Sequence, residues 1–174
     1  MQLKRLFGLT LVILLATGLN AFAQKKQLSP PMESSATING VNVKINYGAP
    51  SVRGRAIWGT KIVKYDEVWR TGANEASTIE VSKDVLIEGK KLKAGKYGLF
   101  TIPRANGKWT IVFNSVANQW GAYNYDSKKD VLRVDVKASS TTENTEQMKI
   151  DIADNGKVTI MWEKVMVPFT ISVK

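Results

Sequence analysis

Apolar and polar residues alternate along most of this chain, and this period of two is the feature that most constrains its fold. The alternation is clear at residues 41–47 and returns at 77–81, 132–137, 148–152 and 158–162. Successive side chains of a β-strand point to opposite faces, so the pattern predicts strands with one buried face. We expect roughly nine to eleven strands and no amphipathic helix after the N-terminal segment.

Turn-forming dipeptides separate these runs. Asn39-Gly40 stands between a short strand expected at 36–38 and the strand at 41–47. Asn106-Gly107 and Asn155-Gly156 also stand between expected strands, as hairpin turns do. Short strands joined by such turns predict an all-β fold. Because most strands have one polar face, we expect one antiparallel β-sandwich domain, jelly-roll-like, over residues 34–174.

Three segments depart from simple alternation. Residues 96–102 are apolar on both faces, which predicts a central strand covered on both sides. Residues 139–146 are polar and predict a loop. The run 165–173 alternates again, but Pro168 within it favours an edge strand or a bulge.

The N-terminal segment has the features of a secretory signal peptide. Lys4 and Arg5 precede an apolar run, and a small-residue cleavage site ends at Ala23. We expect residues 1–23 to be removed by cleavage between Ala23 and Gln24, leaving a periplasmic or secreted protein. An uncleaved N-terminal anchor is the alternative, although the apolar run is short for a membrane span. Residues 24–33, with two prolines, predict an extended leader to the domain.

Composition excludes several kinds of chemistry. The chain has no Cys and no His, which rules out thiolate catalysis, Ser-His triads and Cys/His zinc sites. Any general acid or base must be a carboxylate, Lys or Tyr. We expect no metal, no cofactor and no transmembrane segment after signal cleavage. The formal net charge is +10, but the lysines are scattered over outward strand positions, so we expect no nucleic-acid partner.

Large aromatic and charged residues gather in three irregular segments, 53–59, 69–75 and 119–125, of which the first two lie in the long connection at 48–75. If these segments converge, they form a pocket with aromatic walls and guanidinium groups, suited to a small anionic or carbohydrate ligand. We expect a non-enzymatic ligand-binding or envelope-associated module. The candidate ligand-binding residues are Arg53, Arg55, Trp58, Trp69, Arg70, Asn74, Glu75, Trp120 and Tyr123.

Structural roles are open alternatives for the same residues. Arg70 with Glu75 or Asp66 would make an ion pair that pins the connection, and Trp58 and Trp69 would fill the core beneath it. Two other functions also remain open. Glu75 is the candidate acid/base of a carboxylate-dependent hydrolase acting on glycans. A third alternative is a structural partner of an envelope protein, which would offer an edge strand.

Five motifs carry a family resemblance, and together they cover nearly the whole chain after the predicted signal peptide. Their sequences are YGAP (47–50), VRGRAIWG (52–59), VWRTGANEA (68–76), AGKYGLFTIP (94–103) and QWGAYNY (119–125). In this order they resemble the DUF2911 family of exported bacterial proteins of unknown function. The family often has Arg before the proline of the first motif, where this chain has Ala49. The resemblance implies export and one domain, but it assigns no activity and no catalytic residue.

Overall fold

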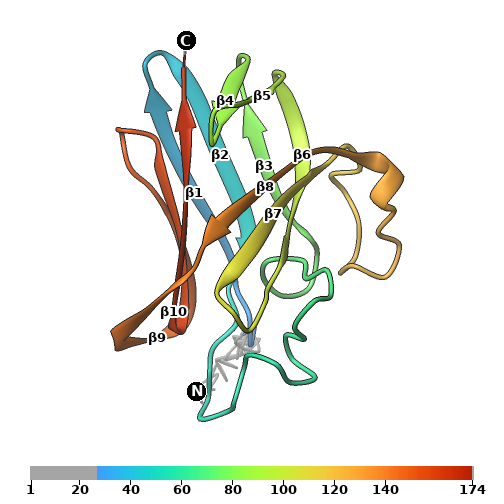
Figure 1. The fold of residues 1–174 in the computed structure, drawn as a ribbon, viewed down its shortest axis with the longest axis vertical. Helices are drawn as coiled ribbons and strands as arrows, with labels where there is room; N and C mark the ends of the chain where they lie inside the picture. Colours follow the sequence, from blue (N-terminus) through green and yellow to red (C-terminus); the bar gives the residue numbers. More distant parts are fainter. Residues whose placement is uncertain (1–26, 174) are drawn as a thin grey trace, which may run out of the picture.

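The protein is an antiparallel β-sandwich of two sheets (Figure 1). The computed structural model describes residues 27–173, so the predicted signal peptide and its cleavage site lie outside the described residues. The larger sheet has the strand order β1-β2-β3-β6-β7-β8, with β1 Pro31–Ile38, β2 Val41–Gly48, β3 Ser77–Val81, β6 Gly95–Ile102, β7 Lys108–Asn114 and β8 Asp130–Lys137. The smaller sheet has the order β5-β4-β10-β9, with β4 Val85–Ile87, β5 Lys90–Leu92, β9 Ser139–Ile152 and β10 Lys157–Ser172.

The predicted hairpins are confirmed. Asn39 and Gly40 have φ values of 47° and 75°, as a tight primed turn requires, and they set the pairing of Ile38 with Val41. β1 starts at Pro31, earlier than the expected short strand at 36–38, and therefore includes the end of the expected leader. Neighbours in the larger sheet follow chain order, and the β4–β5 hairpin crosses to the smaller sheet between β3 and β6.

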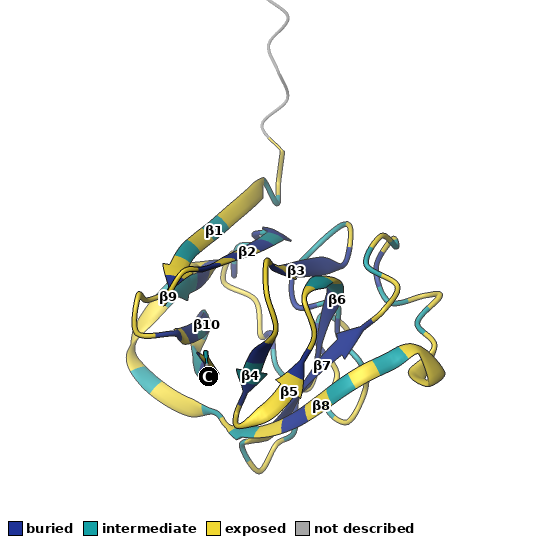
Figure 2. Ribbon diagram, turned by 90° about the horizontal axis from the view of Figure 1, so that it is seen from above, coloured by how far each residue is buried: buried dark blue, intermediate teal, exposed yellow. Residues whose placement is uncertain are grey.

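The core lies between the two sheets, where the inward faces of the strands meet. Figure 2 shows the buried residues concentrated on β2, β3, β6 and β7. The alternation in β2 is strict: Val41, Val43, Ile45 and Tyr47 are buried, and the residues between them face outward. The expected fold class, an all-β sandwich, is confirmed. Strands with one apolar face bury that face when two sheets pack against each other.

Two local expectations were wrong. Residues 139–146 are not a loop but the first half of β9, which pairs with β10 through register shifts around Glu163. Of the two alternatives for 165–173, the edge strand was wrong, because β10 lies between β4 and β9 in the sheet, whereas a bulge does occur where the pairing with β9 shifts register between Met161 and Val165. Polar, Thr-rich strands exposed on both faces resemble loops in sequence, and a proline does not reveal where pairing is interrupted.

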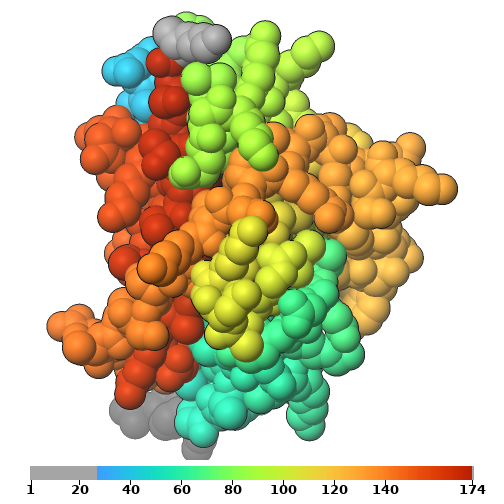
Figure 3. Space-filling model, in the orientation of Figure 1, coloured from blue at the N-terminus to red at the C-terminus, as the bar shows by residue number. Residues whose placement is uncertain are grey.

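The long connection at 49–76 wraps one end of the sandwich and then runs beside β6. Ser51 forms an isolated bridge with Gln147 of β9, and Trp69 forms one with Thr101 of β6. The Asp66 N–H donates to the carbonyl oxygen of Pro103 at 2.8 Å. Figure 3 shows this connection, in teal to green, lying against the yellow β6–β7 turn.

A second, smaller apolar cluster lies on the outer face of the larger sheet. Phe100, Ile102 and Val112 project outward from β6 and β7 and are buried by Ala76 and by partly buried Val68, Ala122 and Tyr125. This explains why residues 96–102 are apolar on both faces, as predicted for a covered strand. The connecting segments therefore cover β6 and β7 but leave the outer face of β1, β2 and β3 open.

Among residues 27–173, no helix has the length and hydrophobicity that crossing a membrane requires.

Candidate functional site

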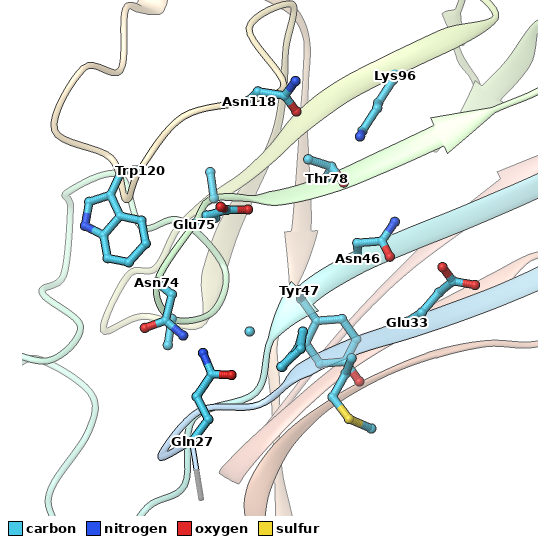
Figure 4. Close-up of a pocket in the computed structure, with 15 residues that line it drawn as sticks. Gln27, Glu33, Asn46, Tyr47, Asn74, Glu75, Thr78, Lys96, Asn118 and Trp120 are labelled. Atoms are coloured by element: carbon cyan, nitrogen blue, oxygen red, sulfur yellow. The ribbon is translucent and has the colours of Figure 1, made fainter. Parts of the chain in front are cut away.

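An open groove of about 540 Å³ lies on the uncovered outer face of β1, β2 and β3 (Figure 4). Polar side chains dominate its lining, and one exposed indole stands at its end. The residues that line it are Gln27, Pro31, Met32, Glu33, Asn46, Tyr47, Gly48, Ala73, Asn74, Glu75, Ala76, Thr78, Lys96, Asn118 and Trp120.

Strand register builds the floor of the groove. Glu33 pairs with Asn46, and Asn46 pairs with Thr78, so these three outward side chains form one row across β1, β2 and β3. Adjacent strands lie about 4.8 Å apart, so the row extends about 10 Å. Lys96 of β6, which pairs with Glu80, adds one cation beside this row. A ligand lying across the strands meets a carboxylate, an amide and a hydroxyl in succession.

The segment before η1 (Ser127–Lys129) forms one wall. Trp120 forms an antiparallel bridge with Glu75, and the Ala76 N–H donates to the carbonyl oxygen of Gln119 at 2.9 Å. The chain can lie this close to β6 because Gly98 has no side chain: a Cβ there would be 2.8 Å from the carbonyl oxygen of Val116. The wall holds Trp120 with 59% of its surface exposed.

The turn at 71–75 closes the end of the groove. Thr71 and Asn74 adopt φ values of 55° and 65°, which are uncommon for residues other than glycine. Thr71 is fully buried, and its carbonyl oxygen accepts a hydrogen bond from the Ser77 hydroxyl at 2.7 Å. The Asn74 carbonyl oxygen accepts from the Gly121 N–H at 3.0 Å and from Arg70 Nη1 at 3.3 Å. The turn at 71–75 is therefore bonded both to the start of β3 and to the segment that carries Trp120.

The leader residues that the structure describes are attached to the same end of the groove. Asn74 Nδ2 donates to the carbonyl oxygen of Ser29 at 3.1 Å, and the Ala49 N–H donates to that of Pro30 at 2.9 Å. Arg53 Nη2 donates to the carbonyl oxygen of Leu28 at 2.7 Å. Residues 28–30 thus follow a defined path beside the groove.

Two of the three predicted segments converge. Asn74, Glu75 and Trp120 line the groove together, and Trp69, Arg70 and Tyr123 line a separate hollow of about 250 Å³. In that hollow Trp69 is only 7% exposed, whereas Tyr123 is 80% exposed.

The two arginines of the first segment line neither hollow. Arg53 donates to Leu28, and Arg55 donates through Nε to the Val52 carbonyl oxygen at 2.9 Å and through Nη2 to that of Ser51 at 2.6 Å. These guanidinium groups bond to backbone carbonyl oxygens. Arg53 and Arg55 therefore stabilise the backbone of this loop and of the leader.

Trp58 and Trp69 belong to a cluster of four indoles inside the sandwich. The ring of Trp69 stacks on that of Trp162 at 5.8 Å, and Trp58 meets Trp69, Trp109 and Trp162 edge-on at 5.1 to 5.8 Å. Trp69 Nε1 donates to the carbonyl oxygen of Gly72 at 3.2 Å. The cluster attaches the long connection to the core, as the structural alternative for these residues proposed.

The expected Arg70 ion pair does not form. Asp66 instead pairs with Arg104 at 3.6 Å, and Glu75 faces the groove. Within residues 27–173, Arg70 forms no ion pair with any carboxylate. Nearness in sequence was a poor guide here, because the turn at 71–75 directs Arg70 and Glu75 into different hollows.

Sequence reasoning missed the residues of the groove floor. The sequence placed Glu33 in the leader, Lys96 at the start of a covered strand and Asn118 in an irregular segment, and it predicted ordinary outward strand positions for Asn46 and Thr78. The Asn39-Gly40 turn contained a usable signal, because a two-residue hairpin loop sets the pairing of Glu33 with Asn46. Nothing in the sequence marked Thr78 as their neighbour.

A polar network anchors the far end of the wall segment. The carboxylate of Asp130 accepts from Tyr125 Oη at 2.6 Å, from Arg133 Nε at 2.7 Å and from Asn114 Nδ2 at 2.7 Å. Burial, together with the hydrogen bond to Asp130, raises the pKa of Tyr125 to about 12. The phenol thus stays protonated near neutral pH and holds the segment that carries Trp120.

The groove carries slightly more negative than positive charge. Its ionisable groups are Glu33, Glu75 and Lys96, and Glu33 also pairs with Lys44 at 3.4 Å. Among the described residues, no group of three or more acidic side chains is placed to hold a metal ion. Amide, hydroxyl and carboxylate groups beside one aromatic face can form hydrogen bonds and a stacking contact side by side.

Fold and groove define this protein as an antiparallel β-sandwich whose larger sheet carries an open, amide-rich groove on its outer face. The chain belongs to the family described as "Protein of unknown function (DUF2911)", whose profile matches residues 29–171. The resemblance inferred from the five motifs is therefore confirmed. A comparison with curated proteins found no match, and neither did a comparison with solved structures.

Proposed function

We propose that this protein is a non-enzymatic binding module whose groove takes a carbohydrate. The observation that supports this most directly is the placement of Trp120, 59% exposed, at the end of a row of hydrogen-bonding side chains. A sugar ring has an apolar face, which stacks on an aromatic ring, and hydroxyl groups, which bond to amides and carboxylates. The groove offers both kinds of contact side by side.

The charge of the groove favours a neutral sugar over a small anion. Two carboxylates, Glu33 and Glu75, face it with one cation, Lys96. Arg53 and Arg55, which supported an anionic ligand in the sequence, bond to backbone carbonyl oxygens away from it. An anion in the groove would meet more negative than positive charge, which lowers its affinity.

The test is a binding assay of neutral oligosaccharides with wild type and two single variants. Trp120→Ala removes the stacking surface and should weaken binding about tenfold, whereas Tyr123→Ala is the matched control. Tyr123 is exposed on the same segment but lines the other hollow. Equal affinities for Trp120→Ala and wild type would contradict the groove as the binding site.

A hydrolase is the second candidate, and one observation favours it. Glu33 and Glu75 both line the groove (Figure 4), and glycoside hydrolysis uses a pair of carboxylates about 5 to 10 Å apart. In this case Glu75 is the acid/base. Glu75→Gln would then abolish release of reducing sugar while leaving oligosaccharide binding intact, and a pure binding module would release none in wild type either.

The protein is exported, in this proposal, to the periplasm or the medium, where it can meet glycans. The Lys4-Arg5 segment, the apolar run and the small-residue site ending at Ala23 support this location. Mass spectrometry of the protein recovered from cells tests it. A mature N-terminus at Gln24 in a periplasmic or culture fraction is expected, and an intact Met1 in the cytoplasm would contradict export.

A further inference from the structure

A second hollow, of about 250 Å³, lies on the other side of the segment that carries Trp120, and the glycan proposal does not use it. Apolar and basic side chains make up most of its lining. The residues around it are Lys61, Ile62, Val63, Lys64, Glu67, Val68, Trp69, Arg70, Ala122 and Tyr123. Its charge is opposite to that of the groove, since three cations face one carboxylate.

Arg70 is the residue that distinguishes this hollow. Its side chain is half-buried, and its one hydrogen bond among the described residues is the 3.3 Å contact from Nη1 to the Asn74 carbonyl oxygen. None of the unbonded side-chain nitrogen atoms of Arg70 is sealed inside the protein, so its other N–H groups remain accessible. A guanidinium group has five donors, and most of those of Arg70 have no protein acceptor.

Gly121 leaves space for the Arg70 side chain. A Cβ atom at Gly121 would lie 2.7 Å from Arg70 Nη1 and 2.9 Å from Tyr123 Cε2. The guanidinium group and the phenol ring therefore approach the same glycine, and a side chain there would displace them. The φ of 64° at Gly121 independently favours glycine at this position.

The other basic residues add to the positive potential. Lys64 pairs with Glu67 at 3.1 Å, so these two charges largely offset each other. Lys61 and Arg70 remain, and no described residue pairs with either as a salt bridge. Apolar neighbours such as Ile62 and Val68 limit solvation and strengthen attraction to an anion.

We propose that this hollow is an oxyanion site, in which Arg70 and Lys61 bind a phosphate, sulfate or carboxylate group and Tyr123 covers the body that carries it. Guanidinium groups bind all three head groups through paired N–H donors. The site is independent of the glycan groove, because its residues and its charge are different.

The test is a titration of ¹⁵N-labelled protein with sodium phosphate, sodium sulfate and sodium acetate in turn, each against sodium chloride at matched ionic strength. Saturable shifts of backbone amides confined to 61–70 and 121–123 are expected, and the salt that saturates first identifies the preferred head group. Arg70→Gln should weaken binding about tenfold, and Lys61→Gln should weaken it severalfold. Arg55→Gln is the matched control for lost charge and should leave the affinity unchanged.

Shifts spread over lysines throughout the surface, or equal affinities for Arg70→Gln and Arg55→Gln, would overturn the proposal. Lys61→Gln still tests the site if Arg70→Gln does not fold, because Lys61 is exposed and makes no described ion pair, so its replacement should not disturb the fold. An unchanged affinity in Lys61→Gln alongside an unfolded Arg70→Gln would also count against the site. Trp120→Ala should keep full phosphate binding, so failure of the glycan proposal is distinguishable from failure of this one.

Discussion

A Cβ atom at Gly48 would overlap the carbonyl oxygen of Ala73, and the Ala73 N–H donates to the Gly48 carbonyl oxygen at 3.1 Å. The end of β2 and the turn at 71–75 therefore meet backbone to backbone. Both residues line the groove, so this contact positions the wall that carries Asn74 and Glu75 against the floor. A strand end and a turn 25 residues later can approach this closely only where one partner is glycine.

Replacing Gly48 with Ala should therefore destabilise the protein and disturb the groove. We expect a loss of about 2 kcal/mol or more in the free energy of unfolding, because the added methyl meets backbone rather than a flexible side chain. Gly54→Ala is the control, since nothing lies within 4 Å of a Cβ there. It should cost about 1 kcal/mol, from the positive φ alone. Urea unfolding measures both, and an equal cost for the two variants would show that the close approach is unimportant.

The indole cluster permits a comparison of two tryptophans that differ in hydrogen bonding. Trp69 Nε1 donates to the Gly72 carbonyl oxygen, whereas Trp162 Nε1 is buried without a partner among the described residues. Both variants to Phe lose ring volume, but Trp69→Phe also leaves a carbonyl oxygen unpaired. We expect Trp69→Phe to lower the free energy of unfolding by about 1–2 kcal/mol more than Trp162→Phe.

Far-UV circular dichroism in urea is the appropriate measurement for this pair, because each variant changes the tryptophan emission. A larger loss in Trp162→Phe than in Trp69→Phe would mean that ring volume, and not the hydrogen bond to Gly72, sets the cost.

Trp120 should be the fluorescence reporter for the groove. It is 59% exposed, whereas Trp69, Trp109 and Trp162 are at most 7% exposed and Trp58 is partly buried against the core. Iodide should therefore quench mainly Trp120, and a bound oligosaccharide should protect it. Trp120→Phe should remove the quenchable fraction and change stability by less than about 0.5 kcal/mol. Quenching that persists in Trp120→Phe would show that the core cluster is accessible.

Tyr125 should make stability depend on pH in the alkaline range. Its pKa is raised to about 12 by burial and by the hydrogen bond to Asp130, from an ordinary value of about 10. Between these values the unfolded chain has lost the proton that the folded chain keeps, so the contribution of Tyr125 is complete below pH 10 and disappears as pH rises through 12. Tyr125→Phe should lack this part of the decline.

Two measurements check the Tyr125 prediction. Absorbance at 295 nm should show one tyrosinate step near pH 12 in wild type that is missing in Tyr125→Phe. Unfolding free energies of the two proteins should diverge less at pH 12 than at pH 9. If they differ by the same amount at both values, the phenol of Tyr125 does not contribute in the way proposed.

Local patterns predicted the strands well and their neighbours less well. The alternation at Val41–Gly48 and the Asn39-Gly40 turn predicted a hairpin with a buried inner face, because both signals act over a few residues. The polar half of β9 had no such signal. Its pairing with β10 is long-range and passes through a bulge at Glu163.

The candidate site shows the same division. Irregular, aromatic-rich segments drew attention to Asn74, Glu75 and Trp120, which the structure brings together in one groove. The same reasoning could not separate Trp120, which is exposed, from Trp58, which packs in the core. Composition states which side chains are present, whereas exposure depends on which way a loop turns at residues such as Gly72 and Gly121.

The sequence alone determined the β-sandwich, the family and the exclusion of thiol and imidazole chemistry. Residue identity, period and motif order are properties of the chain itself, and they hold in any conformation. Only the tertiary structure decided that Arg70 and Glu75 face different hollows, and that Glu33, Asn46 and Thr78 form one floor. Those relations depend on strand register and on close backbone approaches, and both arise only when distant segments pack against each other.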